Sequence, residues 1–317
     1  MIVVLAGGVG GARFIRGLVA AVGASDITAV VNVGDDIEIC GLRICPDLDS
    51  ITYRLAGLND PVQQWGRADE SFVVSEELAR LGMSPSMTLG DRDLALHLYR
   101  TAALRGGATL STVTATVTAS HGLGIRLIPV SDDGIETRIH VVDGRDLHFQ
   151  EWWVGERAAS EVARVEYRGA DVALPAPGVV EAIASATAII VAPSNPVVSI
   201  GPIRAVPGVA EALEITRAPI VGISPIIGGQ VVRGMADRLL PAVGVAVDAA
   251  AVAHWYGARG QRGLLDAWIV DNADEESLAS IRAMGLRAIS TDTMLDDLDV
   301  SAALARTALG IVGRGPI

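Results

Sequence analysis

The N-terminal segment, residues 1–33, combines two different spacings of apolar positions. Ile2–Ala6 is a short run of consecutive apolar residues, which is typical of a strand buried on both faces. Ala12–Val22 has apolar residues at helical spacing, and Ile27–Val33 is a second apolar run. A glycine-rich turn separates the first run from the helix. The pattern therefore predicts one βαβ unit.

Later apolar runs predict further strands of the same kind, at Ile183–Val191, Pro219–Ile223 and Ala267–Val270. Helical spacing dominates between residues 50 and 125. The segments expected to be helical there are Asp49–Leu55, Ser75–Leu81 and Asp91–Arg105.

Leu110–Ala119 (LSTVTATVTA) alternates and is rich in Thr and Val, so we expect a strand at this position. The elements together place the chain in the α/β class. We expect a single Rossmann-like domain over residues 1–317, with a doubly wound, mostly parallel sheet and a mostly helical insertion over residues 50–125.

Composition and charge exclude several classes of function. The formal net charge is −12 without any compensating basic run, which argues against a nucleic-acid partner. All 25 cationic side chains are arginine. Mechanisms that require lysine, such as Schiff-base chemistry or a Walker A loop, are therefore excluded. Arginine remains to bind phosphates, through two parallel hydrogen bonds.

The longest uncharged stretch, Ala182–Ile203, is long enough to span a bilayer, but prolines interrupt it. We interpret it as a buried strand followed by a polar loop. The start of the chain, IVVLAGG, lacks the length and the flanking residues of a signal peptide. We therefore expect a cytoplasmic protein without a membrane partner.

The turn after the first strand contains Gly7, Gly8, Gly10 and Gly11, and Arg13 follows closely. Backbone N–H groups at a helix start attract anions, and glycine allows a phosphate to approach them. The turn therefore predicts a nucleotide or phosphate site, with a tight turn that binds nothing as the alternative. Arg13 takes the place of the third glycine of the dinucleotide fingerprint, which weighs against ordinary NAD binding.

Two acidic segments, NVGDD and PDLDS, follow the second predicted strand. The carboxyl ends of parallel strands line the ligand crevice, and carboxylates repel a phosphate there unless a divalent cation lies between them. We expect at least one of Asp36 and Asp49 to be functional, and both are candidate ligands of Mg²⁺. For Asp35 and Asp47, helix capping and turn formation are the simpler interpretation.

Polar loops also follow two later strands. APSNP carries Ser194 and Asn195 between two prolines, and SPIIGG (Ser224–Gly229) combines the polar Ser224 with the rigid Pro225 and two glycines. Rigid polar loops at such positions commonly bind ligands. The aromatic cluster HFQEWWV (His148–Val154) suits either stacking on a flat ring or core packing. The histidines are scattered without metal-binding spacing, and we interpret each as structural.

The chain resembles the 2-phospho-L-lactate transferase family of coenzyme F420 biosynthesis in a series of motifs that occur in order: LAGGVGGARF, NVGDD, PDLDSITYRL, LGDRD, HFQEWWV, APSNPVVSIGPI, SPIIGG and ADRLLPA. The resemblance implies a homodimeric, Mg²⁺-dependent enzyme. It implies transfer of a phosphoenolpyruvyl or 2-phospho-L-lactyl group from a guanosine-diphosphate-activated donor to the ribityl hydroxyl of the deazaflavin Fo, with release of GMP. The Arg-only, Ala-rich and Gly-rich composition favours the enolpyruvyl donor described for actinobacterial members.

The same resemblance assigns roles to residues by matching motif. Asp49 of PDLDS would bind the deazaflavin, assisted by Arg92 or Thr88 near LGDRD. The glycine turn, together with Ser194 and Asn195, would hold the guanosine diphosphate.

The residues and the resemblance agree on phosphoryl transfer to an alcohol, which depends on positioning and charge neutralisation. We expect the amides of Gly8, Gly10 and Gly11 to cradle the diphosphate. Asp36 and Asp49 would hold Mg²⁺, or Asp49 would orient and deprotonate the acceptor hydroxyl. The alternatives are a non-catalytic nucleotide-sugar-binding regulator of the same superfamily and an NAD-dependent oxidoreductase.

Overall fold

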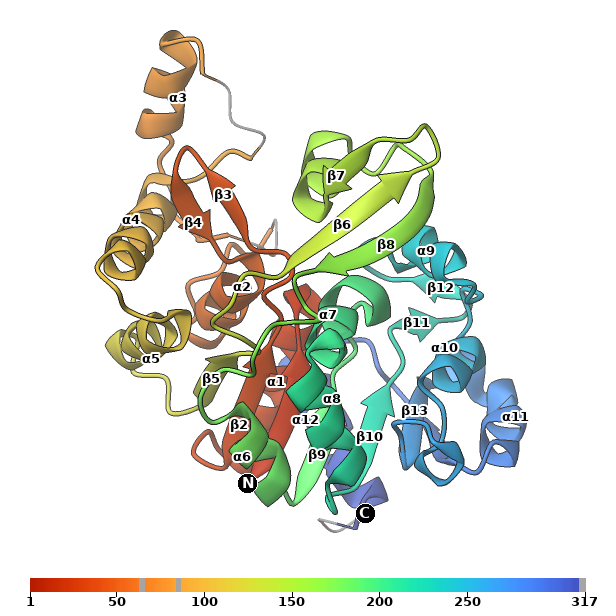
Figure 1. The fold of residues 1–317 in the computed structure, drawn as a ribbon. Coiled ribbons are helices and arrows are strands. Elements are labelled where there is room, and N and C mark those ends of the chain that lie inside the picture. Colours follow the sequence, from red (N-terminus) through yellow and green to blue (C-terminus); the bar gives the residue numbers. More distant parts are fainter. Residues whose placement is uncertain (63–65, 84–86, 314–317) are drawn as a thin grey trace.

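The computed structural model describes residues 1–62, 66–83 and 87–313. Within them, the centre is an all-parallel sheet of seven strands in the order β14-β13-β10-β9-β1-β2-β5 (Figure 1). These strands are β1 (Ile2–Ala6), β2 (Ile27–Val31), β5 (Arg126–Pro129), β9 (Ala188–Val191), β10 (Ile220–Ile223), β13 (Ala267–Asp271) and β14 (Arg287–Thr291). The strand order reverses between β1 and β9, so the sheet is doubly wound, which confirms the predicted fold class.

The central strands are short runs of apolar residues buried throughout their length, as β1, β2 and β9 illustrate. Helices cover both faces of the sheet: α1 (Gly8–Val22) and α12 (Leu298–Ile311) lie on one face, and α6 (Val179–Ser185) and α8 (Pro207–Ile215) lie on the other (Figure 1). A sheet covered on both faces needs apolar residues at every position, which explains the continuous runs in the sequence.

Shorter helices connect the outer strands. They are η2 (Pro196–Ile200), α7 (Gly201–Ala205), α9 (Ala236–Leu239), η3 (Pro241–Val243), α10 (Ala249–Tyr256), η4 (Arg259–Gln261), η5 (Asn272–Ser277) and α11 (Leu278–Ala283). The strand expected over Ile183–Val191 begins only at Ala188, because Ile183 belongs to α6. Strand β14 was not predicted, since its sequence RAIST mixes apolar and polar positions at a sheet edge. Within the described residues, every helix is too short or too polar to cross a membrane.

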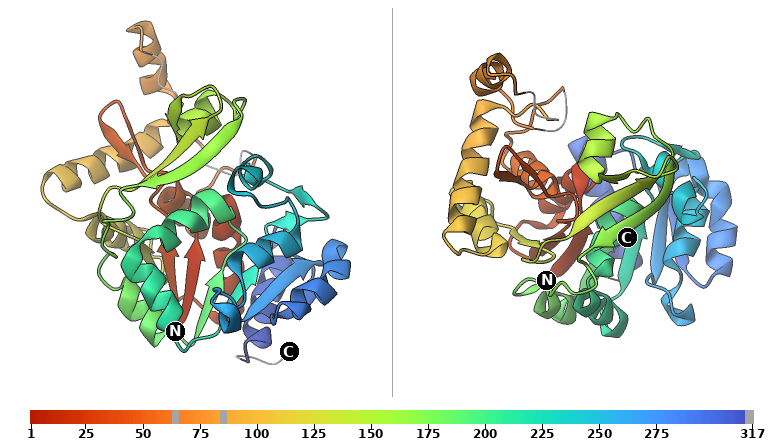
Figure 2. Two further views of the ribbon diagram at one scale, coloured as in Figure 1. Left: turned by 45° about the vertical axis from the view of Figure 1, so that its right-hand side comes forward. Right: turned by 45° about the horizontal axis from the view of Figure 1, so that its top comes forward.

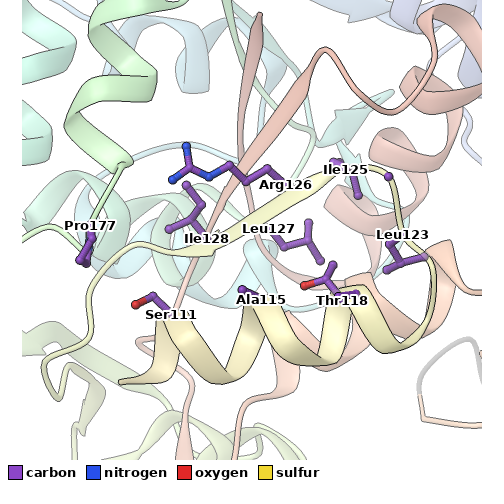
Figure 3. Close-up of a pocket in the computed structure, with 11 residues that line it drawn as sticks. Ser111, Ala115, Thr118, Leu123, Ile125, Arg126, Leu127, Ile128 and Pro177 are labelled. Atoms are coloured by element: carbon purple, nitrogen blue, oxygen red, sulfur yellow. The ribbon is translucent and has the colours of Figure 1, made fainter. Parts of the chain in front are cut away.

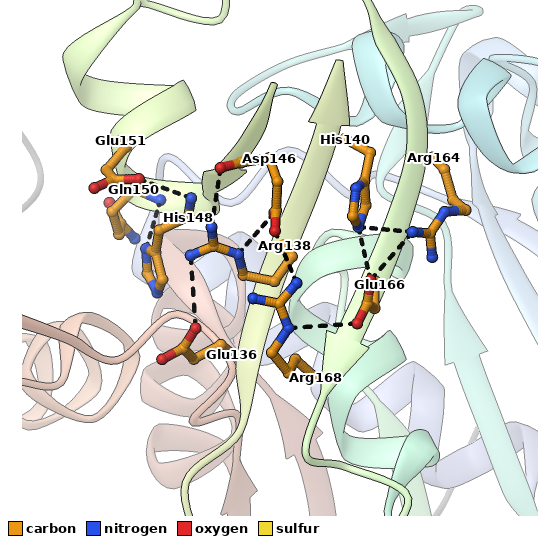
Figure 4. Close-up of polar contacts among 10 residues, drawn as sticks. All are labelled: Glu136, Arg138, His140, Asp146, His148, Gln150, Glu151, Arg164, Glu166 and Arg168. Atoms are coloured by element: carbon orange, nitrogen blue, oxygen red, sulfur yellow. Dashed lines mark hydrogen bonds and ion pairs between the residues drawn. The ribbon is translucent and has the colours of Figure 1, made fainter. Parts of the chain in front are cut away.

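A smaller antiparallel sheet stands over the carboxyl ends of the parallel strands (Figure 2). It contains β7 (Asp146–His148), β6 (Glu136–Val141) and β8 (Val162–Arg168), with the short helix η1 (Glu151–Gly155) between β7 and β8. Opposite charges pair across its strands: Asp146 accepts hydrogen bonds from Arg138 at 2.9 Å and from Arg168 at 2.8 Å (Figure 4). Such exposed pairs contribute about 0–1 kcal/mol each, so burial has to hold this sheet in place.

Two small hairpins complete the strands: β3 (Ile37–Ile39) pairs with β4 (Leu42–Ile44), and β11 (Ile226–Ile227) pairs with β12 (Gln230–Val231). Gly228 and Gly229 form the turn of the second hairpin, with φ angles of 58° and 70°. A two-residue turn of this hand needs positive φ at both positions. The glycines of SPIIGG are therefore required by the hairpin itself.

Helices α2 (Pro46–Leu55), α3 (Val73–Arg80), α4 (Asp91–Arg105) and α5 (Leu110–Ser120) follow β4. The strand expected over Leu110–Ala119 was wrong, because this segment forms α5, which packs along β5 (Figure 3). Leu110, Val113 and Val117 are buried on one face of the helix. The hydroxyl of Thr114 donates to the carbonyl four residues earlier, which satisfies a side chain that sequence rules assign to strands.

Gly17 sets the closest approach between α1 and α12, since a Cβ there would lie 2.5 Å from the Cβ of Ser301. We expect Gly17→Ala to lower the free energy of unfolding by about 1–3 kcal/mol, because overpacking outweighs the better helix propensity of alanine. Denaturant unfolding measures this change. Gly260→Ala is the matched control, because nothing lies within 4 Å of its added Cβ. Equal stability of the two variants would contradict the prediction.

Candidate functional site

The carboxyl ends of the central strands open into a cavity of about 800 Å³. Its wall comes from the turn after β1, the loop after β2, helices α2 and α4, the segment around η1, and the loops after β9, β10 and β14. The cavity therefore lies at the point where the strand order reverses, which is the usual ligand site of a doubly wound sheet. Its volume is in the range of sites for small molecules and cofactors.

A second hollow of about 310 Å³ lies between α5 and β5 (Figure 3). Most of its wall is apolar, and it begins near the amino end of β5, away from the edge where the other strand ends meet. The acidic loops, the glycine turn and the PSNP loop all lie at the larger cavity. We therefore place the candidate site there.

The glycine turn forms the floor of the cavity at the start of α1. The Gly7 N–H donates to Ser194 Oγ at 3.2 Å, and the Gly8 N–H donates to the Asp47 carboxylate at 2.7 Å. The amide of Gly8, expected to hold a phosphate, is therefore already bonded within the protein. The N-cap residue Gly7 has no side chain to bond the first turn of α1, and Asp47 bonds only Gly8 there among the described residues, so the N–H groups of Val9 and Gly10 can meet an anion in the cavity.

The surrounding protein leaves no room for a side chain at several positions of this turn. A Cβ on Gly7 would lie 2.3 Å from Asp47 Oδ2, and a Cβ on Gly10 would lie 2.5 Å from the carbonyl oxygen of Pro193. Gly8 has a φ of 65°, which side chains rarely tolerate. Close packing therefore explains the lack of side chains at this turn.

Asp35 and Asp47 are the carboxylates that line the cavity beside this turn. Asn32 donates its side-chain N–H to Asp47 at 2.8 Å, while Oδ1 of Asp35 is buried without a partner among the described residues. Burial raises the pKa of Asp47 to about 6, and burial together with the Asp47 charge raises the pKa of Asp35. Two carboxyls interpreted as turn formers therefore form an undercompensated pair that faces the ligand space.

Asp36 lies behind this wall and does not line the cavity. Its carboxylate accepts hydrogen bonds from Arg43 at 3.1 Å and from the Cys45 thiol at 3.0 Å. Burial raises the pKa of Asp36 to about 6. The structure thus separates Asp36 from the ligand space into which we expected it to project.

Asp49 does line the cavity, on the first turn of α2. Both of its carboxylate oxygens accept hydrogen bonds from the guanidinium of Arg100, which is itself buried on α4. Asp49 is therefore fixed in orientation and neutralised by a forked ion pair. Removing this carboxylate leaves Arg100 buried and unpaired, so Asp49→Ala lowers stability as well as any activity.

Thr88 and Arg92, which we expected beside Asp49, are exposed and do not line the cavity. Their neighbours Met87 and Leu89 do. The backbone N–H of Arg92 donates to Glu70 at 2.8 Å. In and beside the LGDRD segment, Met87, Leu89 and Asp93 line the cavity in place of Thr88 and Arg92.

Ser194 and Asn195 both line the cavity, as expected. The Ser194 hydroxyl is bonded to the glycine turn through Gly7, donating to its carbonyl at 2.7 Å. Asn195 Oδ1 caps η2 by accepting from Val197 N–H at 2.9 Å. Ser194 therefore holds the loop against the turn after β1, whereas Asn195 stabilises the start of η2. Among the described residues nothing bonds the amide nitrogen of Asn195, which is the group left for a ligand.

Arginines gather at the rim of the cavity, although the whole chain is acidic. Arg13, Arg157 and Arg233 line it, and Arg13 pairs with Asp296 at 2.5 Å. Burial, followed by the charges of Arg13, Arg16 and Arg233, lowers the pKa of Arg54 to about 10. The neighbouring positive charges thus disfavour the protonated form of Arg54. Such an excess of positive charge favours an anionic ligand.

Another part of the cavity wall is apolar and aromatic. Its wall includes Ile44, Met87, Leu89, Phe149 and Trp153. The HFQEWWV motif contributes both to the core and to the cavity. Trp152 is fully buried in the core, whereas Phe149 and Trp153 line the cavity.

Sequence reasoning missed Tyr53, Asp93 and His97, which also line the cavity. His97 had been interpreted as structural. The available signal was helical spacing, since Asp49 and Tyr53 are four residues apart on α2, and Asp93 and His97 are four apart on α4. Single motifs do not reveal this, because the two helices meet only in the folded chain.

The raised pKa of Asp36 makes a testable contribution to stability. The folded carboxyl binds its proton more tightly than an unfolded one, so its stabilising effect is full below about pH 4 and is lost as the pH rises through about 6. We expect Asp36→Asn to gain up to about 3 kcal/mol of unfolding free energy relative to the native chain as the pH rises from about 4 to 7.

Urea unfolding of both chains across this pH range measures the difference. Asp171→Asn, at an exposed position, is the control and should show much less dependence on pH. A constant difference between Asp36→Asn and the native chain would show that Asp36 titrates normally.

Among the described residues, no cluster of three or more His, Cys, Asp or Glu side chains is arranged to hold a metal by itself. Any bound cation would therefore need further ligands from water or from a substrate, as Mg²⁺ commonly does.

Comparison with solved structures supports the fold. A UPF0052 family protein from Bacillus halodurans matches with a TM-score of 0.65 and 18% identity, covering 97% of this chain and 98% of that one. At this level of identity the likeness concerns the fold alone.

Comparison of sequences is more specific. A family model described as 2-phospho-L-lactate transferase CofD matches residues 2–308. The chain is 51% identical over 312 residues to the phosphoenolpyruvate transferase of Streptomyces griseus, covering 97% of each. It is 44% identical over 327 residues to the phosphoenolpyruvate transferase of Mycolicibacterium smegmatis, covering 98% of each. The chain therefore belongs to the 2-phospho-L-lactate transferase CofD family and is a transferase enzyme.

Proposed function

We propose that this enzyme transfers a phosphoenolpyruvyl group from a guanosine-diphosphate-activated donor to the ribityl hydroxyl of the deazaflavin Fo, with release of GMP. The observation that carries the proposal is that one cavity combines two chemically different sets of groups. The first set is the helix start, the carboxylate pair and the arginines. The second set is the apolar and aromatic side chains of Ile44, Met87, Leu89, Phe149 and Trp153, together with Asp49. A charged nucleotide donor and a flat aromatic acceptor need such a pair of subsites.

The donor is assigned to the first set of groups. The N–H groups of Val9 and Gly10 suit a diphosphate, and Arg13 and Arg233 at the rim supply the opposite charge. The enolpyruvyl form is preferred over the 2-phospho-L-lactyl form because the curated relatives are named phosphoenolpyruvate transferases. The family assignment disfavours both a non-catalytic regulator and an NAD-dependent oxidoreductase.

Mg²⁺ is part of the proposal. Asp35 and Asp47 fit a hard cation, because both carboxyls are buried, line the cavity and include an oxygen without a protein partner. They replace the expected pair of Asp36 and Asp49, of which the first is turned away from the cavity and the second is held by Arg100. When bound, the ion would offset the charge of a diphosphate near these carboxylates.

The acceptor is assigned to the second set of groups. Phe149 and Trp153 offer faces for a flat ring, and Met87 and Leu89 add apolar surface. Asp49, with its orientation fixed by Arg100, is available to orient the polar tail of the acceptor.

The reaction requires the acceptor hydroxyl oxygen to form a bond to the phosphorus that carries the three-carbon group. The bond from that phosphorus to the GMP oxygen breaks, and GMP leaves with the electron pair. Such a transfer depends on in-line positioning and on neutralising the leaving phosphate, which the arginines at the rim suit. The resemblance to the family further supports a homodimer that acts in the cytoplasm.

Incubation of the purified chain with Fo and each candidate donor tests this function. We expect enolpyruvyl-diphospho-5′-guanosine to give GMP and a phosphoenolpyruvyl-Fo product in equal amounts, read by mass spectrometry. EDTA should stop turnover and excess Mg²⁺ should restore it. Reactions without Fo are the control. Turnover with only the lactyl donor would overturn the donor assignment, and no turnover with either donor would overturn the function.

Trp153 tests the acceptor subsite separately. We expect Trp153→Leu to weaken Fo binding about two- to tenfold, because a stacked aromatic pair contributes about 0.5–1.5 kcal/mol. Fluorescence titration of Fo measures the dissociation constant without any donor. Phe72→Leu, at an exposed residue outside the cavity, is the control. Unchanged binding by Trp153→Leu would place the ring elsewhere.

A further inference from the structure

The cavity wall at α2 and α4 contains two carboxylates in very different surroundings. Asp49 and Tyr53 project from α2, and Asp93 and His97 project from α4, with all of them on the cavity wall. The spacing of four residues places each pair on one face of its helix. The two faces meet, since the Tyr53 hydroxyl donates to Asp93 and His97 approaches both carboxylates.

Asp49 is poorly suited to accept a proton. The guanidinium of Arg100 donates to both of its oxygens. A proton on either oxygen would displace one of these charge-assisted bonds and leave the buried Arg100 undercompensated. Asp49 therefore suits orientation of a substrate better than removal of its proton.

Asp93 is held from one side only. Tyr53 donates to its Oδ1, and His97 Nε2 lies 3.4 Å from the same oxygen. Arg100 Nη1 lies 3.3 Å from His97 Nδ1. Because arginine only donates, Nδ1 accepts and the proton of the neutral ring sits on Nε2, facing Asp93. Among the described residues no group donates to Asp93 Oδ2, and this side chain is 15% exposed at the cavity.

The backbone under Asp93 is fixed as well. Glu70 accepts hydrogen bonds from the N–H groups of Arg92 and Asp93 at 2.8 and 2.9 Å, which caps the start of α4. Asp91 instead accepts from Val73 and Val74 at the start of α3, both at 3.1 Å. The LGDRD motif thus uses one aspartate to cap a neighbouring helix and presents the other to the cavity.

We infer that Asp93 Oδ2 accepts the proton of the acceptor hydroxyl, with Tyr53 and His97 as positioning residues. This inference rests on the proposed function. As the hydroxyl oxygen bonds to phosphorus, its proton moves to Asp93, the bond to GMP breaks, and GMP keeps the electron pair. Asp93 then loses the proton to water. An aspartate plays the same part toward the substrate hydroxyl in protein kinases.

The electrostatic surroundings leave Asp93 ionised at neutral pH. Burial alone would raise its pKa, but the side chains of His97 and Tyr53 bring the pKa below the usual value. The other charged or titratable groups around it are Asp49 on α2, Arg100 on α4, and Arg67 and Glu70 before α3.

Asp93→Asn tests the inference, because it removes the base and keeps the shape. We expect kcat to fall about 100-fold or more and the acidic limb of the pH profile of kcat to disappear. Fo binding, measured by fluorescence, should change less than about threefold, since the amide keeps the acceptor for Tyr53. Asp91→Asn is the matched control in the same motif and should keep native kcat, because the Asp91 carboxylate bonds Ser71 and the start of α3 and, unlike Asp93, does not line the cavity.

Tyr53→Phe provides a second readout, which also decides the question if Asp93→Asn fails to fold. Loss of a donor to the charged carboxylate raises the pKa of Asp93, so the acidic limb should move to higher pH. A merely structural role of Asp93 would leave the limb in place. Asp49→Asn should weaken Fo binding and retain the limb.

The outcomes separate the two proposals. Suppose that the native chain catalyses the reaction. If Asp93→Asn then has a nearly normal kcat, or if the acidic limb does not move in Tyr53→Phe, the role of Asp93 is overturned and the proposed function stands. Weakened Fo binding with unchanged kcat in Asp93→Asn assigns it to binding and also overturns the inference. Absence of native turnover overturns both.

Discussion

The hydrogen bond from the Gly8 N–H to Asp47 joins the first turn of the chain to the start of α2, and the cavity depends on this contact. Asn32 adds a second bond to the same carboxylate and a third to the loop after β9, through the Val198 carbonyl at 3.1 Å. Three segments that are distant in sequence are thereby held around one carboxyl group. A side chain on Gly7 would collide with it, so the glycines and Asp47 require each other.

This contact also explains the charge of the site. A carboxylate fixed beside a helix start receives partial positive charge from the backbone, yet the pKa of Asp47 stays raised because the side chain is buried and the charge of Asp36 adds to this effect. Arginines at the rim of the cavity compensate this negative charge, although the chain as a whole is negatively charged. Such an arrangement is suited to a ligand that brings phosphates, and to a cation that neutralises them.

The four aspartates of NVGDD and PDLDS show how far tertiary structure differentiates similar residues. Asp35 and Asp47 face the ligand space, Asp49 is locked by Arg100, and Asp36 is bonded to Arg43. They lie close in sequence and have the same intrinsic chemistry. Their proposed roles differ: a pair suited to bind a metal ion, one residue that orients a substrate, and one that supports the structure. The role of each depends on the strand, helix or cationic side chain that it contacts in the fold.

The doubly wound parallel sheet could be predicted from the sequence alone, because short, continuous apolar runs bounded by turns can be buried in few other ways. The sequence also determined the glycine turn and the loop with Ser194 and Asn195, since both follow strands directly and strand ends share one edge. It did not determine α5, because Leu110, Val113 and Val117 fit either a strand or a helix until β5 provides a surface. Nor did it determine the wall with Asp93 and His97: those side chains meet α2 only once α4 packs against it, and contacts between distant helices leave no local pattern in the chain.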